Sequence, residues 1–266
     1  MDYIYGSAGM DAASWLMLAC YASEDPVDLR LNVSLGRFFT YNTVQIPGIT
    51  GHIHNEQHSL EKLVGCSHIV RHPSTVLTQH RELLNGHRSA VVWFTGLPSS
   101  GKSTIAHAVE ERLFKLGCRT FVLDGDNIRH GLCSDLGFSD KDRTENIRRI
   151  GEVARLFAEA GLILLTAFIS PFRLDRERVR KVVGDDHFIE VFCDCPPEIC
   201  EQRDPKGNYR NAREGIIGHF TGVSAPYERS EKYDLILKTG ECAPEECVDQ
   251  VIELLRQRQL LQCSAA

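Results

Sequence analysis

The chain has 266 residues, 42% of them hydrophobic, which is enough to bury a full-sized core and to form one or two domains. Its formal net charge is −6 and its pI is about 6.0, so no overall positive field is present to attract nucleic acid. We therefore expect no nucleic-acid partner, and a local basic cluster is expected to bind a smaller anion.

The first part of the chain differs from the remainder. Residues 1–65 show turn signals but little periodicity, so we predict an N-terminal extension of unknown role, followed by a folded domain over 66–262. The apolar run 12–22 is too short to span a bilayer, and no Lys or Arg precedes Arg30. We therefore expect neither a membrane partner nor an export signal. The extension also carries His52, His54 and His58, which are consistent with either a metal site or a solvated loop.

The ten cysteines are scattered along the chain and show no paired C-x-x-C spacing. This pattern fits neither a zinc site nor a disulfide framework. We expect reduced thiols in a cytoplasmic protein.

From residue 68 onward, strand and helix patterns alternate. Helices are predicted over 74–84, with Ser74 as the N-cap, and over 104–116, 142–160, 174–183, from 197 onward, and 244–260. Strands are predicted over 91–94, 120–123, 162–169, 188–193 and 235–237. This alternation predicts a parallel sheet with helices on both faces, which is a three-layer α/β fold.

A glycine-bounded loop lies between the first of these strands and its helix. Residues 96–103 match the pattern G-x-x-x-x-G-K-[ST], which predicts a phosphate-binding loop of the P-loop NTPase fold. Lys102 would reach the β- and γ-phosphates, and the Ser103 hydroxyl would hold Mg²⁺. The alternative is a loop that only connects two elements. The predicted ATP-binding residues of this loop are Gly96, Leu97, Pro98, Ser99, Ser100, Gly101, Lys102, Ser103 and Thr104.

Two further polar sites follow strands whose carboxyl ends are expected at the same edge of the sheet. Asp124 and Asp126 bracket a glycine, so one carboxylate could lie near Mg²⁺ while the other accepts a proton from an attacking hydroxyl. The alternative is an Asx-type turn that leads into a helix. Ser170 follows the strand over 162–169, where it could bind a phosphate, act as a nucleophile or cap the next segment.

Two basic clusters stand out in an acidic chain. The first contains Arg129, Arg143, Asn146, Arg148 and Arg149, and its position near the phosphate loop indicates an anionic second substrate. The second contains Arg203, Lys206, Arg210 and Arg213, interrupted by Pro205 and Gly207, and its composition is typical of a mobile lid that closes over phosphates.

Several of these segments resemble adenylylsulfate (APS) kinases, the P-loop kinases of sulfate assimilation. They are Leu123-Asp-Gly-Asp-Asn-Ile-Arg129, Asp135-Leu-Gly-Phe-Ser139, Glu145-Asn-Ile-Arg-Arg149, Phe168-Ile-Ser-Pro-Phe-Arg173, Arg203-Asp-Pro-Lys-Gly207 and Phe220-Thr-Gly-Val-Ser-Ala-Pro-Tyr227. The resemblance runs in register from about residue 68 to about residue 240. It implies transfer of the ATP γ-phosphate to the 3′-hydroxyl of APS, giving PAPS and ADP, with Mg²⁺ as the cofactor.

The resemblance also implies roles for individual residues. It assigns Asp124 to the metal and Asp126 to the general base, with Lys102 and Ser170 as further candidate active-site residues. Ser170 is not expected to be an obligatory nucleophile, since direct in-line transfer needs none. The remaining roles are APS binding by Asp126, Arg129, Arg143, Asn146 and Ser170, stacking on its adenine by Phe138 and Phe220, and ATP contacts in the lid by Arg203 and Lys206.

One departure from the family pattern concerns the loop, where Pro98 and Ser99 replace the usual Ser and Gly. If Ser99 must adopt a positive φ, the cost is about 1 kcal/mol. Relatives suggest a homodimer and an association with ATP sulfurylase. Two alternative functions stay open: another small-molecule P-loop kinase, and a non-catalytic nucleotide-binding subunit that holds such a partner. A GTPase is disfavoured because no N-K-x-D motif is present.

Overall fold

The computed structural model of the chain describes residues 42–46, 49–53 and 72–261, and divides the chain into two compact units, Met1–Arg71 and His72–Ala266. In the first unit, β1 (Asn42–Ile46) pairs antiparallel with β2 (Ile49–Ile53). His52 lies in β2, whereas His54, His58 and the apolar run 12–22 lie outside the described residues.

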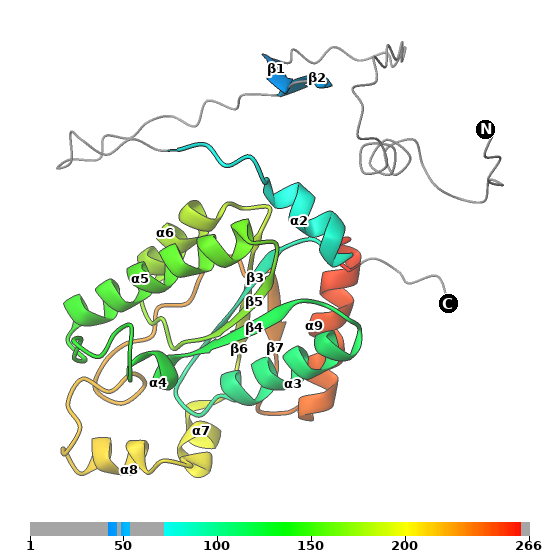
Figure 1. Cartoon of the computed structure of the whole chain (residues 1–266). Helices are drawn as coiled ribbons and strands as arrows, with labels where there is room; N and C mark the ends of the chain where they lie inside the picture. Colours follow the sequence, from blue (N-terminus) through cyan, green and yellow to red (C-terminus); the bar gives the residue numbers. More distant parts are fainter. Residues whose placement is uncertain (1–41, 47–48, 54–71, 262–266) are drawn as a thin grey trace. The chain divides into compact units, whose positions relative to one another are not determined.

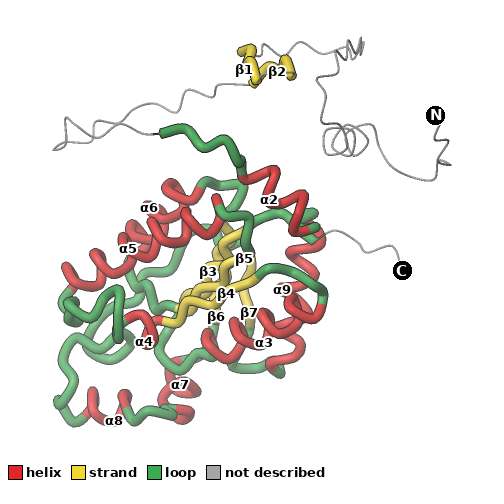
Figure 2. Tube along the Cα trace, viewed as in Figure 1, coloured by secondary structure: helices red, strands yellow, loops and turns green. Residues whose placement is uncertain are grey.

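The second unit is built on a parallel sheet of five strands (Figures 1 and 2). The strands are β3 (Ala90–Thr95), β4 (Thr120–Asp124), β5 (Ile163–Ala167), β6 (Phe188–Cys193) and β7 (Leu235–Leu237), in the order β4-β5-β3-β6-β7. Every residue of β3, β5 and β6 is buried, because helices cover both faces of the sheet.

Successive residues of β3 point to opposite faces of the sheet and so enter different cores. Val92 and Phe94 pack with α3 (Lys102–Lys115) and α9 (Pro244–Gln257), whereas Val91 and Trp93 pack with α5 (Asp140–Glu159) and α6 (Arg173–Val183). Figure 1 shows these two helix pairs on either side of the strands. The predicted three-layer α/β fold is therefore confirmed.

The helix before the sheet begins later than predicted. The helix α2 runs from Thr78 to Asn85, so the prediction of Ser74 as its N-cap is wrong. The hydroxyl of Ser74 instead donates to the carbonyl of Val76 at 2.8 Å, in a local turn that satisfies the side chain before the helix starts. The backbone N–H of Leu77, at the N-cap position, donates to Nδ1 of His80 at 3.3 Å.

The other predicted elements are present with small shifts at their ends. The helix α5 starts at Asp140 because the Ser139 hydroxyl accepts from the Asp142 N–H and caps it. The helix predicted from 197 onward is α7 (Pro197–Arg203). The helix α4 (Gly125–Ile128) was expected only under the Asx-turn alternative, and α8 (Asn208–Arg213) was not predicted. Among the described residues, no helix combines the length and apolarity that a membrane crossing requires.

Replacing Gly151 by alanine tests how closely α5 and α6 pack. A Cβ at this position would lie 2.9 Å from Cγ2 of Val179, whose β-branched side chain is stiff at χ1. The gain of about 1 kcal/mol in helix propensity should be outweighed by an overpacking cost of about 1–3 kcal/mol. We therefore expect a lower free energy of unfolding in urea titrations.

The control variant for this experiment is Gly131→Ala, because a Cβ there meets no atom of the described residues within 4 Å. Its free energy of unfolding should stay within about 0.5 kcal/mol of the parent value. Equal stabilities of the two variants would contradict the proposed crowding.

Candidate functional site

The carboxyl ends of the parallel strands lie at one edge of the sheet, and the predicted phosphate-binding loop follows β3 there. Gly96 has φ +143°, and a Cβ on it would lie 2.7 Å from the carbonyl oxygen of Cys193, so only glycine fits where the loop passes the end of β6. Ser99 has φ 60°, so the loop does require a left-handed backbone at this position, at a cost of about 1 kcal/mol.

The Lys102 ammonium is buried among acceptors of its own loop. It donates to the carbonyl of Leu97 at 2.5 Å, to that of Gly96 at 3.1 Å, and to the Ser100 hydroxyl at 3.4 Å. Burial lowers the pKa of Lys102 to about 8, against the smaller opposing effects of neighbouring thiols and carboxylates. An incoming triphosphate would replace these neutral acceptors with charged ones.

The side chain of Asp124 has two separate contacts. Its Oδ2 accepts from the Ser103 hydroxyl at 2.5 Å, and its Oδ1 accepts from the Asp126 N–H at 3.0 Å and so caps α4. The turn and the metal site therefore do not exclude each other, because each uses its own oxygen. A hydroxyl and a carboxylate in contact fit Mg²⁺, which takes few protein oxygens and completes its shell with phosphates and water.

The side chain of Asp126 forms an ion pair with Lys206, which lies between α7 and α8 in the predicted lid segment. Both side chains are exposed, so the pair is open to exchange with a ligand. The sequence placed Lys206 near ATP and did not predict this contact with the candidate base.

The residues predicted to bind the second substrate surround Arg143. Its Nε donates to the carbonyl of Phe138 at 2.9 Å and its Nη2 to the carbonyl of His219 at 2.7 Å. Burial, followed by the nearby charge of Arg129, lowers the pKa of Arg143. The guanidinium thus joins the segment of Phe138 to the segment of Phe220, which are far apart in the sequence.

The two predicted aromatic residues differ in exposure. Phe138 is 61% exposed, and the guanidinium carbon of Arg129 lies 4.3 Å from the centre of its ring. Phe220 is 8% exposed and contacts Tyr209 edge-on, with the ring centroids 5.0 Å apart. Asn146 is buried on α5, and among the described residues its Oδ1 has no hydrogen-bond partner, although buried polar atoms are usually hydrogen-bonded.

The Ser170 hydroxyl is buried rather than presented at the surface. It accepts from Trp93 Nε1 at 3.1 Å and donates to Thr95 Oγ1 at 2.9 Å, and the residue is 2% exposed. Its carbonyl accepts from Nη1 of Arg176 at 2.6 Å, and Arg176 forms a buried ion pair with Glu190 at 2.8 Å. In this conformation the side chain links the segment after β5 to Trp93 and Thr95 of β3.

Thr239 and Tyr209 also lie near the loop, and neither was predicted as a site residue. Arg203 lies near Gly101, and its Nη2 donates to the carbonyl of Thr239 at 2.7 Å. Within the part of the chain that the structure describes, the buried Oγ1 of Thr239, just after β7, has no hydrogen-bond partner. Tyr209 is 1% exposed, and its hydroxyl donates to the carbonyl of Pro98 at 3.2 Å. Neither residue belongs to a pattern with a known chemical role, although Thr239 and Gly240 follow a predicted strand.

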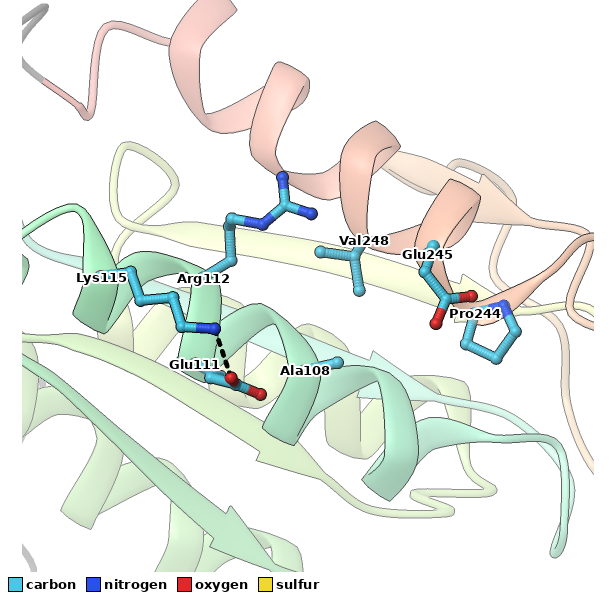
Figure 3. Close-up of a pocket in the computed structure, with 7 residues that line it drawn as sticks. All are labelled: Ala108, Glu111, Arg112, Lys115, Pro244, Glu245 and Val248. Atoms are coloured by element: carbon cyan, nitrogen blue, oxygen red, sulfur yellow. Dashed lines mark hydrogen bonds and ion pairs between the residues drawn. The ribbon is translucent and has the colours of Figure 1, made fainter.

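A separate pocket of about 180 Å³ lies between α3 and α9 (Figure 3). Its lining includes Glu111 and Lys115, which pair with each other, and Val248 of α9. None of the predicted site residues lines this pocket, so we assign it no part in the site at the edge of the sheet.

Comparison with known proteins gives a consistent result. The family model described as adenylylsulphate kinase matches residues 88–238. The adenylyl-sulfate kinase of Acaryochloris marina is 59% identical over 200 residues, covering 75% of this chain and 98% of its own. That of Escherichia coli is 57% identical over 193 residues, covering 73% of this chain and 96% of its own. The structure of the Mycobacterium tuberculosis APS kinase in complex with AMPPNP and APS superposes with a TM-score of 0.62 at 49% identity, covering 64% of this chain and 99% of that one.

The buried Lys102 predicts proton uptake when a triphosphate binds. Above pH 8 a growing fraction of Lys102 is neutral in the free protein, because its pKa is about 8. Bound phosphates favour the charged form, so at about pH 9 close to one proton should enter per AMPPNP bound, and affinity should fall as pH rises. Calorimetry in two buffers of different ionisation enthalpy measures this uptake.

The control is Lys102→Arg, whose guanidinium stays charged throughout this pH range. The uptake should vanish in this variant even if its affinity is lower. Identical binding heats in both buffers for the parent protein would contradict the prediction.

Proposed function

Because the chain belongs to the adenylylsulfate kinase family, we propose that it transfers the ATP γ-phosphate to the 3′-hydroxyl of APS at the carboxyl edge of its sheet, giving PAPS and ADP. The observation that carries this assignment is the convergence of Lys102, Ser103, Asp124 and Asp126 at the ends of β3 and β4. These groups supply a phosphate cradle, a metal site and a candidate base in one volume.

On the ATP side, the loop N–H groups and the positive end of α3 attract the phosphates. Lys102 would exchange the carbonyls of Gly96 and Leu97 for the β- and γ-phosphates. Ser103 and Asp124 would hold Mg²⁺, which neutralises charge on the phosphates when it is bound. Arg203 and Lys206 would close over the nucleotide from the lid.

On the acceptor side, Asp126 acts as the general base. Its carboxylate accepts the proton of the 3′-hydroxyl as that oxygen attacks the γ-phosphorus, and ADP leaves from the opposite side. The ion pair with Lys206 must open first, since Lys206 occupies the carboxylate in the free protein. Because both side chains are exposed, opening this ion pair costs little free energy.

Recognition of APS would fall to the residues around Arg143. Arg129 and Arg143 would bind the phosphosulfate, and the free Oδ1 of Asn146 would accept a hydrogen bond from the ligand. Phe138 and Phe220 would stack on the adenine. Ser170 stays a candidate active-site residue, and its hydrogen bonds to Trp93 and Thr95 support a positioning role.

The wider assignments are also proposals. A kinase domain over 66–262 is supported by the compact unit that starts at His72. A homodimer is supported by the apolar side chains of Phe114 and Phe121, exposed by 74% and 47% near the edge strand β4. Association with ATP sulfurylase would bring APS directly to its consumer. The buried free thiols of Cys193 and Cys200 fit a reducing, cytoplasmic location.

Replacing Asp126 by asparagine tests the base. The amide keeps the size of the side chain but cannot take the proton, so kcat should fall about 10²–10⁴-fold. A coupled assay of ADP release from Mg-ATP that depends on APS measures this loss. Asp185→Asn is the matched control, because this side chain is 85% exposed and pairs only loosely with Arg180, at 3.9 Å.

Two results would contradict the proposal. Normal turnover by Asp126→Asn would show that another group takes the proton. A requirement for gluconate or shikimate in place of APS would indicate a different small-molecule kinase, and nucleotide binding without any acceptor-dependent turnover would indicate a non-catalytic subunit.

A chain that starts at Ser67 tests the proposed domain. The sheet and both of its cores lie within the unit that begins at His72, so kcat/KM for APS should stay within about twofold of the full chain. Kinetics of both proteins at equal concentration provide the comparison. A large loss of activity with an unchanged thermal midpoint would assign the extension a direct role in catalysis.

A further inference from the structure

We infer that Tyr209 is a positioning residue that couples the phosphate-binding loop to the aromatic contact for the second nucleotide; this inference rests on the function proposed above. Tyr209 is 1% exposed and lies at the start of α8, within the predicted lid segment 203–213. It touches residues of both proposed subsites, each with a different part of its side chain.

The hydroxyl of Tyr209 contacts the ATP side. It donates to the carbonyl of Pro98, at the turn of the phosphate-binding loop, at 3.2 Å. The carbonyl of the preceding residue, Leu97, accepts from Lys102 at 2.5 Å. The stretch 97–98 therefore accepts hydrogen bonds from both Lys102 and Tyr209.

The ring of Tyr209 contacts the APS side. It meets Phe220 edge-on, with the ring planes at 78° and the centroids 5.0 Å apart, which is a favourable aromatic geometry. Both rings belong to a small hydrophobic core of buried residues, with Leu97 packed against it. A shift of the loop would therefore be transmitted to Phe220 through closely packed atoms.

The neighbourhood leaves little space for independent motion. Gly222 has φ +91°, and a Cβ on it would lie 3.1 Å from Cδ2 of Leu97 and 3.6 Å from the Tyr209 hydroxyl. The carboxylate of Asp204 accepts from the N–H groups of Tyr209 and Arg210, both at 3.1 Å, and fixes the start of α8. The segment that carries Phe220 thus lies directly against the loop and the lid.

A triphosphate that draws Lys102 away from the Leu97 carbonyl changes one of the two restraints on this stretch. The other restraint, the Tyr209 hydroxyl, then links the rearranged loop to the position of Phe220. Such a coupling is reciprocal, so each ligand must alter the affinity of the other by the same factor.

Calorimetry measures this factor as the ratio of AMPPNP dissociation constants without and with saturating APS. We expect a ratio of at least about fivefold in the parent protein. In Tyr209→Phe, which keeps the ring and loses the hydrogen bond, the ratio should fall to below about twofold. Tyr233→Phe is the matched control, because the Tyr233 hydroxyl accepts from the Ser230 N–H at 2.8 Å, outside the loop and lid, and should keep the parent ratio.

A second variant, Tyr209→Leu, separates the ring from the hydroxyl. It should also weaken APS binding in the absence of nucleotide by about fivefold, since Phe220 loses its edge-on partner, whereas Tyr209→Phe should leave that binding within about twofold. Thermal midpoints are recorded for all variants.

Three results would overturn the inference: a parent ratio near one, an unchanged ratio in Tyr209→Phe, or equal weakening of both ligands at a constant ratio, which would indicate a structural role alone. A parent protein that binds AMPPNP but not APS would instead refute the proposed function.

Discussion

The site depends on one buried ammonium group. Lys102 belongs to the phosphate-binding loop, and carbonyl and hydroxyl oxygens of that loop partly replace the water that its buried ammonium has lost. Its lowered pKa reports that this replacement is incomplete. A polyanion is the ligand that best stabilises the charged form of Lys102. The burial of this ammonium in the free protein therefore favours binding of a ligand that carries phosphates. Holding the loop around this group requires a strained backbone at Ser99 and a glycine at position 96, where the loop passes close to β6.

Much of the fold follows from local patterns in the chain. The buried strands are short, mostly apolar runs, such as AVVWFT in β3 and ILLTA in β5, and their alternation with helical segments allows few arrangements other than a covered parallel sheet. The ends of elements were harder to predict, because local hydrogen bonds compete there. Ser74 illustrates this point: a serine before a helical pattern predicts a cap, but its hydroxyl is satisfied within a tighter turn.

The phosphate-loop pattern and the pair Asp124 and Asp126 could be recognised in the sequence because each depends on spacing within one short segment. The environments of Ser170 and Tyr209 could not, because they depend on contacts with distant parts of the chain. The indole N–H of Trp93, in β3, donates to the Ser170 hydroxyl, which follows β5. The hydroxyl of Tyr209, in α8, donates to the carbonyl of Pro98. The unpartnered oxygens of Asn146 and Thr239 likewise become visible only when burial is known.

The ion pair between Arg176 and Glu190 has a consequence for how the protein responds to salt. The two side chains are 1% and 5% exposed, so dissolved ions scarcely screen them, and the same guanidinium fixes the carbonyl of Ser170 at the rim of the sheet. The strength of this buried ion pair should therefore change little with ionic strength. High ionic strength would weaken the exposed ion pair between Lys206 and Asp126 while leaving the buried ion pair in place.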